Sequence, residues 1–321
     1  MLRADPAINL LGIQEAARVV DPVFRDSPQF LSEQLSARLG VETVLKVETA
    51  NPIRSFKGRG TDYLLHRLGE GAGSLVCASA GNFGQGMAYA ARKRGVRLTV
   101  FAAESANPLK VERMRALGAA VVLEGVDFDG AKEAATRRAQ ATGDLYIEDG
   151  LWGPIAEGAA TMAVELARSE ERLAAVFVPL GNGSLVNGIG TWLRHASPAT
   201  RVIAVCAEGA PAMEMSWREG RPVSTAAIDT IADGIAVRVP IAEALDLMRG
   251  TIDEVMLVSD EQILDAMRLL LLDAGLVVEP AGAAGLAAIQ ARREEFAGRR
   301  VATPLCGGNL TEEQVHRWLR P

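Results

Sequence analysis

One lysine stands out in this sequence because of its position. Lys57 lies in the segment NPIRSFKGRG, residues 51–60, just before the amphipathic run TDYLLHRL. The dipole of a helix disfavours positive charge in its first turn, so a lysine there needs an explanation. The same field, together with nearby Arg54 and Arg59, should favour the neutral amine. A neutral lysine amine can form a Schiff base with an aldehyde or accept a proton; the alternative is a solvated surface lysine.

Two glycine-rich turns have the composition of anion sites. SAGNFGQG, residues 79–86, joins a strand to a helix, so its backbone N–H groups can hold a carboxylate, and Asn82 adds an amide. A tight turn that needs glycine for backbone reasons is the alternative there. GNGSL, residues 181–185, also opens a helix and suits a phosphate, with Ser184 adding a hydroxyl. It fits neither a P-loop nor G-x-G-x-x-G, which counts against ATP hydrolysis and dinucleotide binding.

A thiol and a carboxylate stand at two further element ends. Cys306 of LCGGN closes the last predicted strand, where it could hydrogen-bond a ring nitrogen or simply fill the core. Glu279 precedes the helix PAGAAGLAA, where it either stabilises the helix dipole or contacts a cofactor. A Schiff-base lysine, a phosphate cradle, a carboxylate cradle and a ring-nitrogen partner on one scaffold together indicate pyridoxal 5′-phosphate (PLP).

The elements that carry these residues alternate between short apolar strands and helices. SLVCASA, VRLTVFAA, AAVVLEG and DLYIED read as strands followed by helices, and the rhythm resumes from Gly153 to the strand RRVATPLCGG. Such alternation predicts parallel sheets with right-handed crossovers. Nearer the N-terminus, FLSEQLSARLG is predicted to be helical from Phe30 onward. We therefore predict two packed α/β units with a ligand cleft at the carboxyl ends of the strands.

Composition narrows the class of partner. The chain has 321 residues, 49% of them apolar, with a net charge of −6 and scattered basic residues. This argues against nucleic acid or a membrane surface and favours small molecules. Cys77, Cys206 and Cys306 are widely spaced, so neither a disulfide framework nor a zinc site is expected. With no signal segment and no apolar run of ~18 residues, we expect a soluble cytoplasmic protein.

The motifs, in their order along the chain, resemble those of a known family. S-F-K-x-R-G, S-A-G-N-x-x-Q-G, P-x-G-x-G-x-L, A-E-G-A-P-A-M, I-A-D-G-I-A-V, E-P-A-G-A and C-G-G-N occur between residues 51 and 309. The sequence is similar to the fold-type-II PLP enzymes, specifically the serine/threonine dehydratases (ammonia-lyases) and serine racemases. The resemblance implies an α/β fold like the tryptophan synthase β-subunit, with two packed domains, each an open, mostly parallel sheet flanked by helices. It places the active site in the cleft between a large cofactor-binding domain, residues 1–62 and 152–321, and a small domain, residues 63–151.

The resemblance also implies a role for each motif residue. Lys57 would hold the cofactor aldehyde as a Schiff base and, once displaced by substrate, remove the α-proton. Phe56 would pack on the pyridine ring, Asn82 would bond its phenolic oxygen, and Cys306 would face its nitrogen. The remaining implied cofactor residues are Gly181, Asn182, Gly183, Ser184, Leu185 and Glu279. The implied substrate-binding residues are Ser79, Ala80, Gly81, Asn82 and Gly234. Arg54 is a further candidate for substrate binding.

The sequence departs from the family pattern at three positions. Phe83 stands where the family often has histidine, and Ala80 stands where racemases carry a serine base, so weak or absent racemisation is expected. Arg54 lies where relatives commonly have a small residue or histidine. It could reach an acidic substrate side chain such as that of hydroxyaspartate, or be a surface arginine.

A cation site is a further implication of the resemblance. Glu208, the carbonyl of Ala212 and Glu214 fall at the spacing of the family's structural cation site, and such oxygen ligands suit Mg²⁺, Ca²⁺ or K⁺. Carboxylates at the start of a surface helix are the alternative.

The predicted function is PLP-dependent β-elimination of L-threonine or L-serine to a 2-oxo acid and ammonia. The rival functions are threonine synthase-like β-replacement, hydroxyaspartate ammonia-lyase activity, and a non-catalytic amino-acid-binding module that keeps the site. A homodimer, the usual state of the family, is expected.

Overall fold

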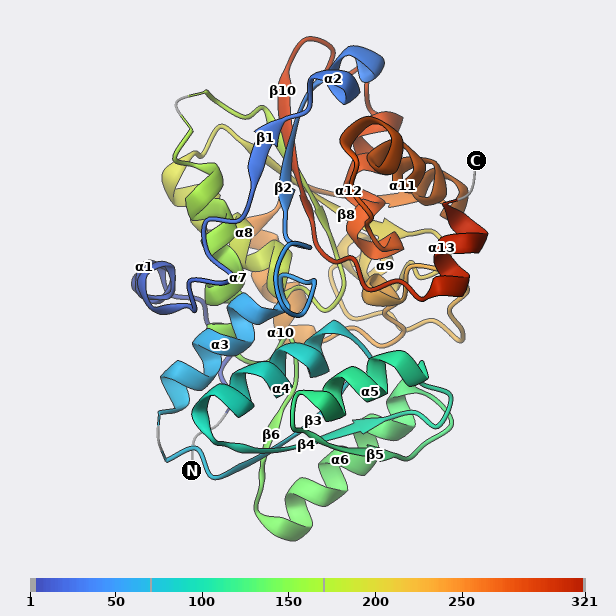
Figure 1. Cartoon of the computed structure of the whole chain (residues 1–321). Coiled ribbons are helices and arrows are strands. Elements are labelled where there is room, and N and C mark those ends of the chain that lie inside the picture. Colours follow the sequence, from blue (N-terminus) through green and yellow to red (C-terminus); the bar gives the residue numbers. More distant parts are fainter. Residues whose placement is uncertain (1–3, 70, 170, 320–321) are drawn as a thin grey trace.

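Two separate β-sheets organise the computed structural model, which describes residues 4–69, 71–169 and 171–319 (Figure 1). The larger sheet has six strands, all paired in parallel except for the edge pair β1–β2. Their spatial order is β1 (Gln29–Leu31), β2 (Glu42–Val47), β10 (Arg300–Leu305), β7 (Ala175–Pro179), β8 (Arg201–Ala207) and β9 (Glu254–Val258).

The smaller sheet has four strands and is parallel throughout. Its spatial order is β5 (Ala120–Leu123), β4 (Arg97–Ala102), β3 (Ser74–Ala78) and β6 (Leu145–Ile147). Two mostly parallel, open sheets in one chain confirm the predicted fold class.

Helices cover both faces of the larger sheet, because its strands carry apolar side chains on both sides. One face packs against α2 (Glu33–Leu39), α11 (Asp260–Ala274), α12 (Pro280–Ala291) and α13 (Glu312–Trp318). The other packs against α7 (Gly153–Leu166), α8 (Ser184–Ala196), α9 (Ala212–Glu219) and α10 (Ala242–Thr251). The result is a three-layer unit with the sheet in the middle (Figure 1).

The smaller sheet is covered in the same way. Its faces pack against α3 (Lys57–Leu68), α4 (Asn82–Arg94) and α5 (Pro108–Ala116) on one side and α6 (Phe128–Thr142) on the other. Helix α3 packs against α4 and α7, and so joins the two units, while α1 (Leu10–Val19) lies against α7 (Figure 1). The predicted domain boundary after residue 62 falls inside α3; the division into residues 1–62 with 152–321 and 63–151 stays a prediction.

One predicted element is shorter than expected. Phe30 and Leu31 belong to strand β1 and are exposed, and the helix begins only at Glu33, after Ser32. The spacing of Leu35 and Leu39 was a correct helix signal, because both are buried against the larger sheet. None of the helices in the described part of the chain is long and apolar enough to cross a membrane.

Candidate active site

The segment before Lys57 is a tight loop held by Asn51. The Asn51 amide donates to the carbonyl of Glu48 at 2.7 Å and accepts from the N–H groups of Ile53 and Ser55. Arg54 is forced to a φ of 49°, in the left-handed region that side chains other than glycine rarely adopt. Strain of this kind persists where the surroundings fix the backbone, and it clusters at functional sites.

Backbone hydrogen bonds join the loop to the residues that follow β10, which brings the segments of Lys57 and Cys306 together. The N–H of Phe56 donates to the carbonyl of Cys306 at 3.0 Å, and the N–H of Gly308 donates to the carbonyl of Arg54 at 3.0 Å. Lys57 follows directly as the first residue of α3. The structure therefore places Lys57 beside the segment that carries the Cys306 thiol.

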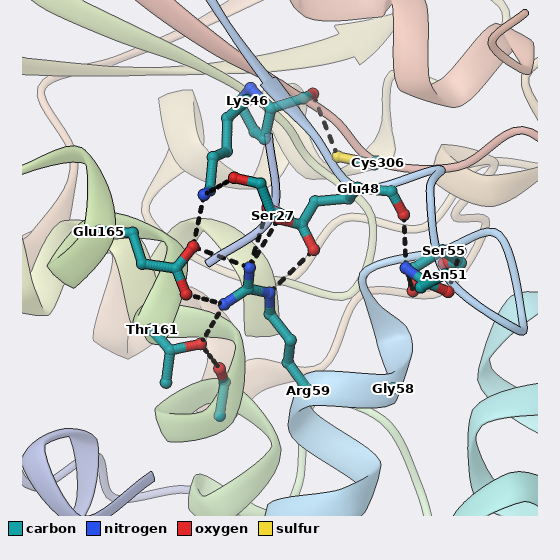
Figure 2. Close-up of polar contacts among 12 residues, drawn as sticks. Ser27, Lys46, Glu48, Asn51, Ser55, Gly58, Arg59, Thr161, Glu165 and Cys306 are labelled. Carbon is teal, nitrogen blue, oxygen red and sulfur yellow. Dashed lines mark hydrogen bonds and ion pairs between the residues drawn. The ribbon is translucent and has the colours of Figure 1, made fainter. Parts of the chain in front are cut away.

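A buried cluster of charges fixes the helix that carries Lys57 (Figure 2). The fully buried guanidinium of Arg59 donates to Glu48 at 2.8 and 2.9 Å and to Glu165 of α7 at 2.6 and 2.9 Å. Lys46 of β2 pairs with Glu165 and donates to the carbonyl of Ser27 at 2.8 Å. The cluster holds two cations and two anions, so it ties α3 to β2 and α7 without excess charge.

The pKa values follow from this pairing. Burial opposes the charge of Arg59, yet the Glu48 and Glu165 carboxylates outweigh it and raise its pKa. Burial lowers the pKa of Lys46, in spite of its pair with Glu165. The charge of Arg59 is thus balanced by its own partners, and its action on Lys57 stays a prediction.

The amine of Lys57 lies in a small aromatic and acidic environment. Its Nζ atom is 4.7 Å from the centre of the Phe56 ring and 5.9 Å from that of Phe83. The same atom forms a salt bridge with Asp149, with side chains 18% and 11% exposed. This contact gives the amine an acidic partner, and the neutral form of the amine stays a prediction.

The GNGSL turn has the geometry of an anion cradle. It joins β7 to α8, with Gly183 at a φ of 96°, and the N–H groups of Ser184, Leu185 and Val186 donate to no other described residue. Four residues of the first helical turn lack intrahelical acceptors in any helix, so these donors are available. A Cβ at Gly181 would lie 3.1 Å from the carbonyl oxygen of Gly234, which brings that predicted residue against the cradle.

The SAGN turn offers fewer free donors than expected. The Ser79 N–H already donates to the Phe101 carbonyl at 2.9 Å, and the Ser79 hydroxyl accepts from the N–H groups of Gly81 and Gly84. Among described residues, the N–H groups of Ala80, Asn82 and Phe83 have no acceptor. These three N–H groups are the donors that remain available for a carboxylate.

Asn82 and Glu279 form a polar junction across the two units. The Asn82 amide donates to Glu279 at 2.5 Å and accepts from the Asn309 amide at 2.8 Å. Burial and the charge of nearby Asp233 raise the pKa of Glu279 to about 7. Glu279 is 3% exposed and also accepts from the N–H of Asn309, so it positions Asn82 rather than merely starting α12.

A second link between the units runs from α5 to the short helix η1 (Asp233–Ile235). Lys110 pairs there with Asp233, the residue before Gly234. Burial of Lys110 favours its neutral form, but Asp233 and Glu279 outweigh burial and raise the pKa of Lys110.

The side chain of Cys306 is buried, only 5% exposed, and its thiol is unreactive. Its thiol donates to the carbonyl of Pro304 at 3.4 Å. Burial, followed by the charges of Glu48 and Glu279, raises the pKa of Cys306 well above its ordinary range. The thiol is therefore neutral and able to donate a hydrogen bond.

The predicted cation ligands lie between two elements: Glu208 directly follows β8, and Ala212 and Glu214 belong to the first turn of α9. Ala212 begins α9, and its carbonyl accepts a hydrogen bond from Ser216 at 2.6 Å, while Glu214 lies 3.9 Å from Arg218. Within the described ranges no group of three or more histidine, cysteine or acidic side chains could hold a metal ion. Two carboxylates and a carbonyl are a different ligand set, so the cation stays a prediction.

Sequence reasoning missed Asp149, Asn309 and Lys110. Asp149 follows the carboxyl end of β6, the same kind of position that drew attention to the other turns, so it could have been found. Asn309 is the last residue of the C-G-G-N motif, in which only Cys306 was expected to have a role. Lys110 gave no sequence signal, because its partner lies 123 residues away.

These residues fit PLP. An amine for the aldehyde, unpaired N–H donors and a hydroxyl for the phosphate, an amide for the phenolic oxygen and a neutral thiol for the ring nitrogen lie around one junction. The backbone also approaches closely there: a Cβ at Gly307 would lie 2.2 Å from Glu279 Oε1 and 2.9 Å from Asn82 Nδ2. Only glycine leaves that junction intact.

Comparison with known proteins gives the class. The family described as pyridoxal-phosphate dependent enzyme matches residues 20–307, most of the chain. The chain belongs to this family, and PLP is its cofactor.

Relatives narrow the similarity further. An L-threonine ammonia-lyase of Thermotoga maritima is 35% identical over 312 residues, covering 97% of this chain and 78% of that protein. The structure of processed threonine deaminase isoform 2 from Solanum lycopersicum has a TM-score of 0.89 and 28% identity, covering 99% of this chain and 95% of that one. Maize serine racemase, at a TM-score of 0.90, 24% identity and coverage of 97% and 96%, shares the fold.

Proposed function

We propose that this chain is a PLP-dependent ammonia-lyase that removes the β-hydroxyl and amino groups of L-threonine or L-serine, giving a 2-oxo acid and ammonia. The observation that carries this proposal is the neutral thiol of Cys306 beside the Lys57 segment. A carboxylate in that position would stabilise a protonated pyridine ring and the accumulation of negative charge at the α-carbon. A thiol does not, so prompt β-elimination is favoured. The similarity to proteins named as threonine ammonia-lyases supports the same reaction.

The roles of the main residues follow from their chemistry. When bound, PLP supplies an electron-withdrawing ring that makes the α-proton of an amino acid acidic. Lys57 would hold the aldehyde and, once free, take the α-proton. The N–H groups of residues 183–186 would hold the phosphate, and the Cys306 thiol would donate to the ring nitrogen. Asn82 would donate to the phenolic oxygen, and its N–H and that of Phe83 would hold the substrate carboxylate.

Two smaller roles complete the assignment. Phe56 would pack on the ring, because it lies under the Lys57 amine. Ala80 carries no hydroxyl, so the opposite face of the substrate lacks a base at this position, and racemisation of serine should be slower than pyruvate release. Faster interconversion of L- and D-serine would contradict this assignment.

A second candidate substrate is threo-3-hydroxyaspartate, favoured by one pair of residues. Burial and the neighbouring charge of Arg54 lower the pKa of Arg113, which donates to Asn309 beside Asn82. Two adjacent guanidinium groups suit an acidic substrate side chain. If Arg54 serves this purpose, Arg54→Ala lowers the rate on hydroxyaspartate relative to threonine; an unchanged ratio would leave Arg54 as a surface residue.

Assembly, location and cation binding are also proposals. We propose a cytoplasmic homodimer with a cation held by Glu208, the carbonyl of Ala212 and Glu214. Light scattering of the purified protein tests the dimer. A rise in melting temperature on adding Mg²⁺, Ca²⁺ or K⁺, lost in Glu208→Gln, tests the cation.

The proposed reaction is tested by following 2-oxo acid release from L-threonine, L-serine and hydroxyaspartate in turn, with PLP present. Release from threonine or serine supports the lyase, and release from hydroxyaspartate alone supports the second candidate. Activity only with O-phosphohomoserine, or with O-acetylserine and sulfide, would mean β-replacement. An absence of turnover with all of these substrates would favour a binding module.

A further inference from the structure

Asp149 lies where both units meet the cofactor site. It follows strand β6 of the smaller sheet, and the turn that it forms with Gly150 packs against the phosphate cradle of the larger unit. Gly150 has a φ of 100°, and a Cβ there would lie 3.0 Å from the carbonyl oxygen of Asn182. The position of Asp149 is thus set by backbone contact with the cradle rather than by a loose loop.

The two oxygens of Asp149 have different partners. Oδ2 forms the salt bridge with Lys57 Nζ, and Oδ1 accepts from the Ser184 hydroxyl at 2.7 Å. In the described part of the chain, this is the carboxylate that contacts the lysine amine. A proton can pass between the amine and the carboxyl group along this contact, so the two groups can share one proton.

Elimination of a β-hydroxy amino acid needs a base and an acid at neighbouring atoms. The base takes the α-proton, and the acid must protonate the hydroxyl, because hydroxide is a poor leaving group. A carboxyl group one hydrogen bond from Lys57 Nζ lies within reach of a substituent on the next carbon. Resting on the proposed lyase reaction, we propose that Asp149 is the acid that protonates the departing β-hydroxyl.

The proton balance of this step closes within the pair. Moving the shared proton from Lys57 to Asp149 gives a neutral amine and a carboxylic acid. The amine takes the α-proton as the bond from Cβ to oxygen breaks, and the departing oxygen takes the bond electrons and the Asp149 proton, leaving as water. The pair then again holds one proton, the one taken from the α-carbon, and is ready for the next substrate.

Other acids near the site are less suited. Glu279 is fully engaged with Asn82 and Asn309, and the raised pKa of Cys306 makes its thiol a poor proton donor. His66 and His316 lie on the surface beside glutamates.

The test compares two leaving groups. Chloride departs from β-chloro-L-alanine without a proton, whereas hydroxide departs from L-serine only with one. Asp149→Asn should lower kcat/KM for serine by about 100-fold or more, and for chloroalanine only a few-fold. The control, Glu148→Gln, removes the adjacent carboxylate, which pairs with Lys132, and should leave the ratio of the two substrates unchanged. An equal loss on both substrates, or no loss on serine, would overturn the proposal.

A second measurement needs neither cofactor nor turnover. Cofactor-free protein is treated with acetic anhydride near pH 8, and acetylation of Lys57 is followed by peptide mass spectrometry. Without the salt bridge, Lys57 should be acetylated several-fold faster in Asp149→Asn than in the parent protein or Glu148→Gln. Equal rates would show that the contact does not hold the amine and would overturn the assignment even if the variant were inactive. Failure of the parent protein on both serine and threonine would instead defeat the proposed lyase reaction.

Discussion

Two lysine–carboxylate pairs in this chain serve opposite purposes. Lys46 and Glu165 are 1% and 7% exposed and belong to a cluster in which Arg59 and Glu48 complete the charge balance. Lys57 and Asp149 are 18% and 11% exposed and, among the residues that the structure describes, have one further side-chain hydrogen-bond partner, Ser184. The first pair is saturated with hydrogen bonds, while the second can still exchange a partner.

Because the two pairs differ in this way, one helix can be held rigidly and still carry a reactive amine. Arg59, two residues after Lys57, locks α3 between β2 and α7 through buried ion pairs. Lys57 then needs no fixed partner of its own and can change its bonding during a reaction. A buried ionic cluster costs stability when broken but stabilises little relative to apolar packing, so its value here is positional.

The largest effect on activity is expected from the reactive pair. Lys57→Ala should lower 2-oxo acid release by at least about 1000-fold, because the Schiff-base amine and the α-proton base are lost together. Its free energy of unfolding, measured in urea without cofactor, should change by about 1 kcal/mol or less because the pair is partly exposed. A large loss of stability with retained activity would show that the Lys57–Asp149 pair is structural rather than reactive.

The largest effect on stability is expected from the saturated cluster. Arg59→Met should lower the free energy of unfolding by about 3–5 kcal/mol, because Glu48 and Glu165 would be left buried with one cation between them. The matched control is Arg38→Met, which removes an exposed arginine from its pair with Asp273 and should cost under about 1 kcal/mol. Equal losses in the two variants would mean that burial does not distinguish these ion pairs.

A smaller, pH-dependent effect is expected at Glu279. Its pKa is raised from 4.5 to about 7, so the folded protein keeps a proton that the unfolded chain releases. This residue's contribution to stability should therefore fall as the pH rises between these values, by about 3 kcal/mol at most. Glu279→Gln should remove that slope from urea unfolding of the cofactor-free protein. A slope that is unchanged in the variant would show that Glu279 is ionised throughout this range.

Much of the scaffold could be predicted because local signals and tertiary structure agree. GNGSL was predicted to end a strand and open a helix, and β7 and α8 meet there. The helix predicted from Phe30 began too early because the exposed residues of a short edge strand happened to match helical spacing. The spacing of apolar residues can match a helix even where the chain forms a strand. Which of these residues are buried becomes known only from the structure.

The partners of the charged residues around the site were harder to predict than the scaffold. Arg59 was expected to act on Lys57, and the partners that balance its charge lie 11 and 106 residues away in sequence. Asp149 was overlooked although it ends a strand, because its contact with Lys57 spans 92 residues and both units. The type and position of a charged residue can be seen in one sequence, but its partner depends on packing.

The role of Lys57 as the residue that carries the cofactor is tested most directly by incubating the protein with PLP, reducing it with borohydride and mapping the modified peptide by mass spectrometry. We expect one pyridoxyl phosphate group on Lys57, none on Lys46, and no incorporation in Lys57→Ala. Modification of a different lysine, or none at all in the parent protein, would contradict it.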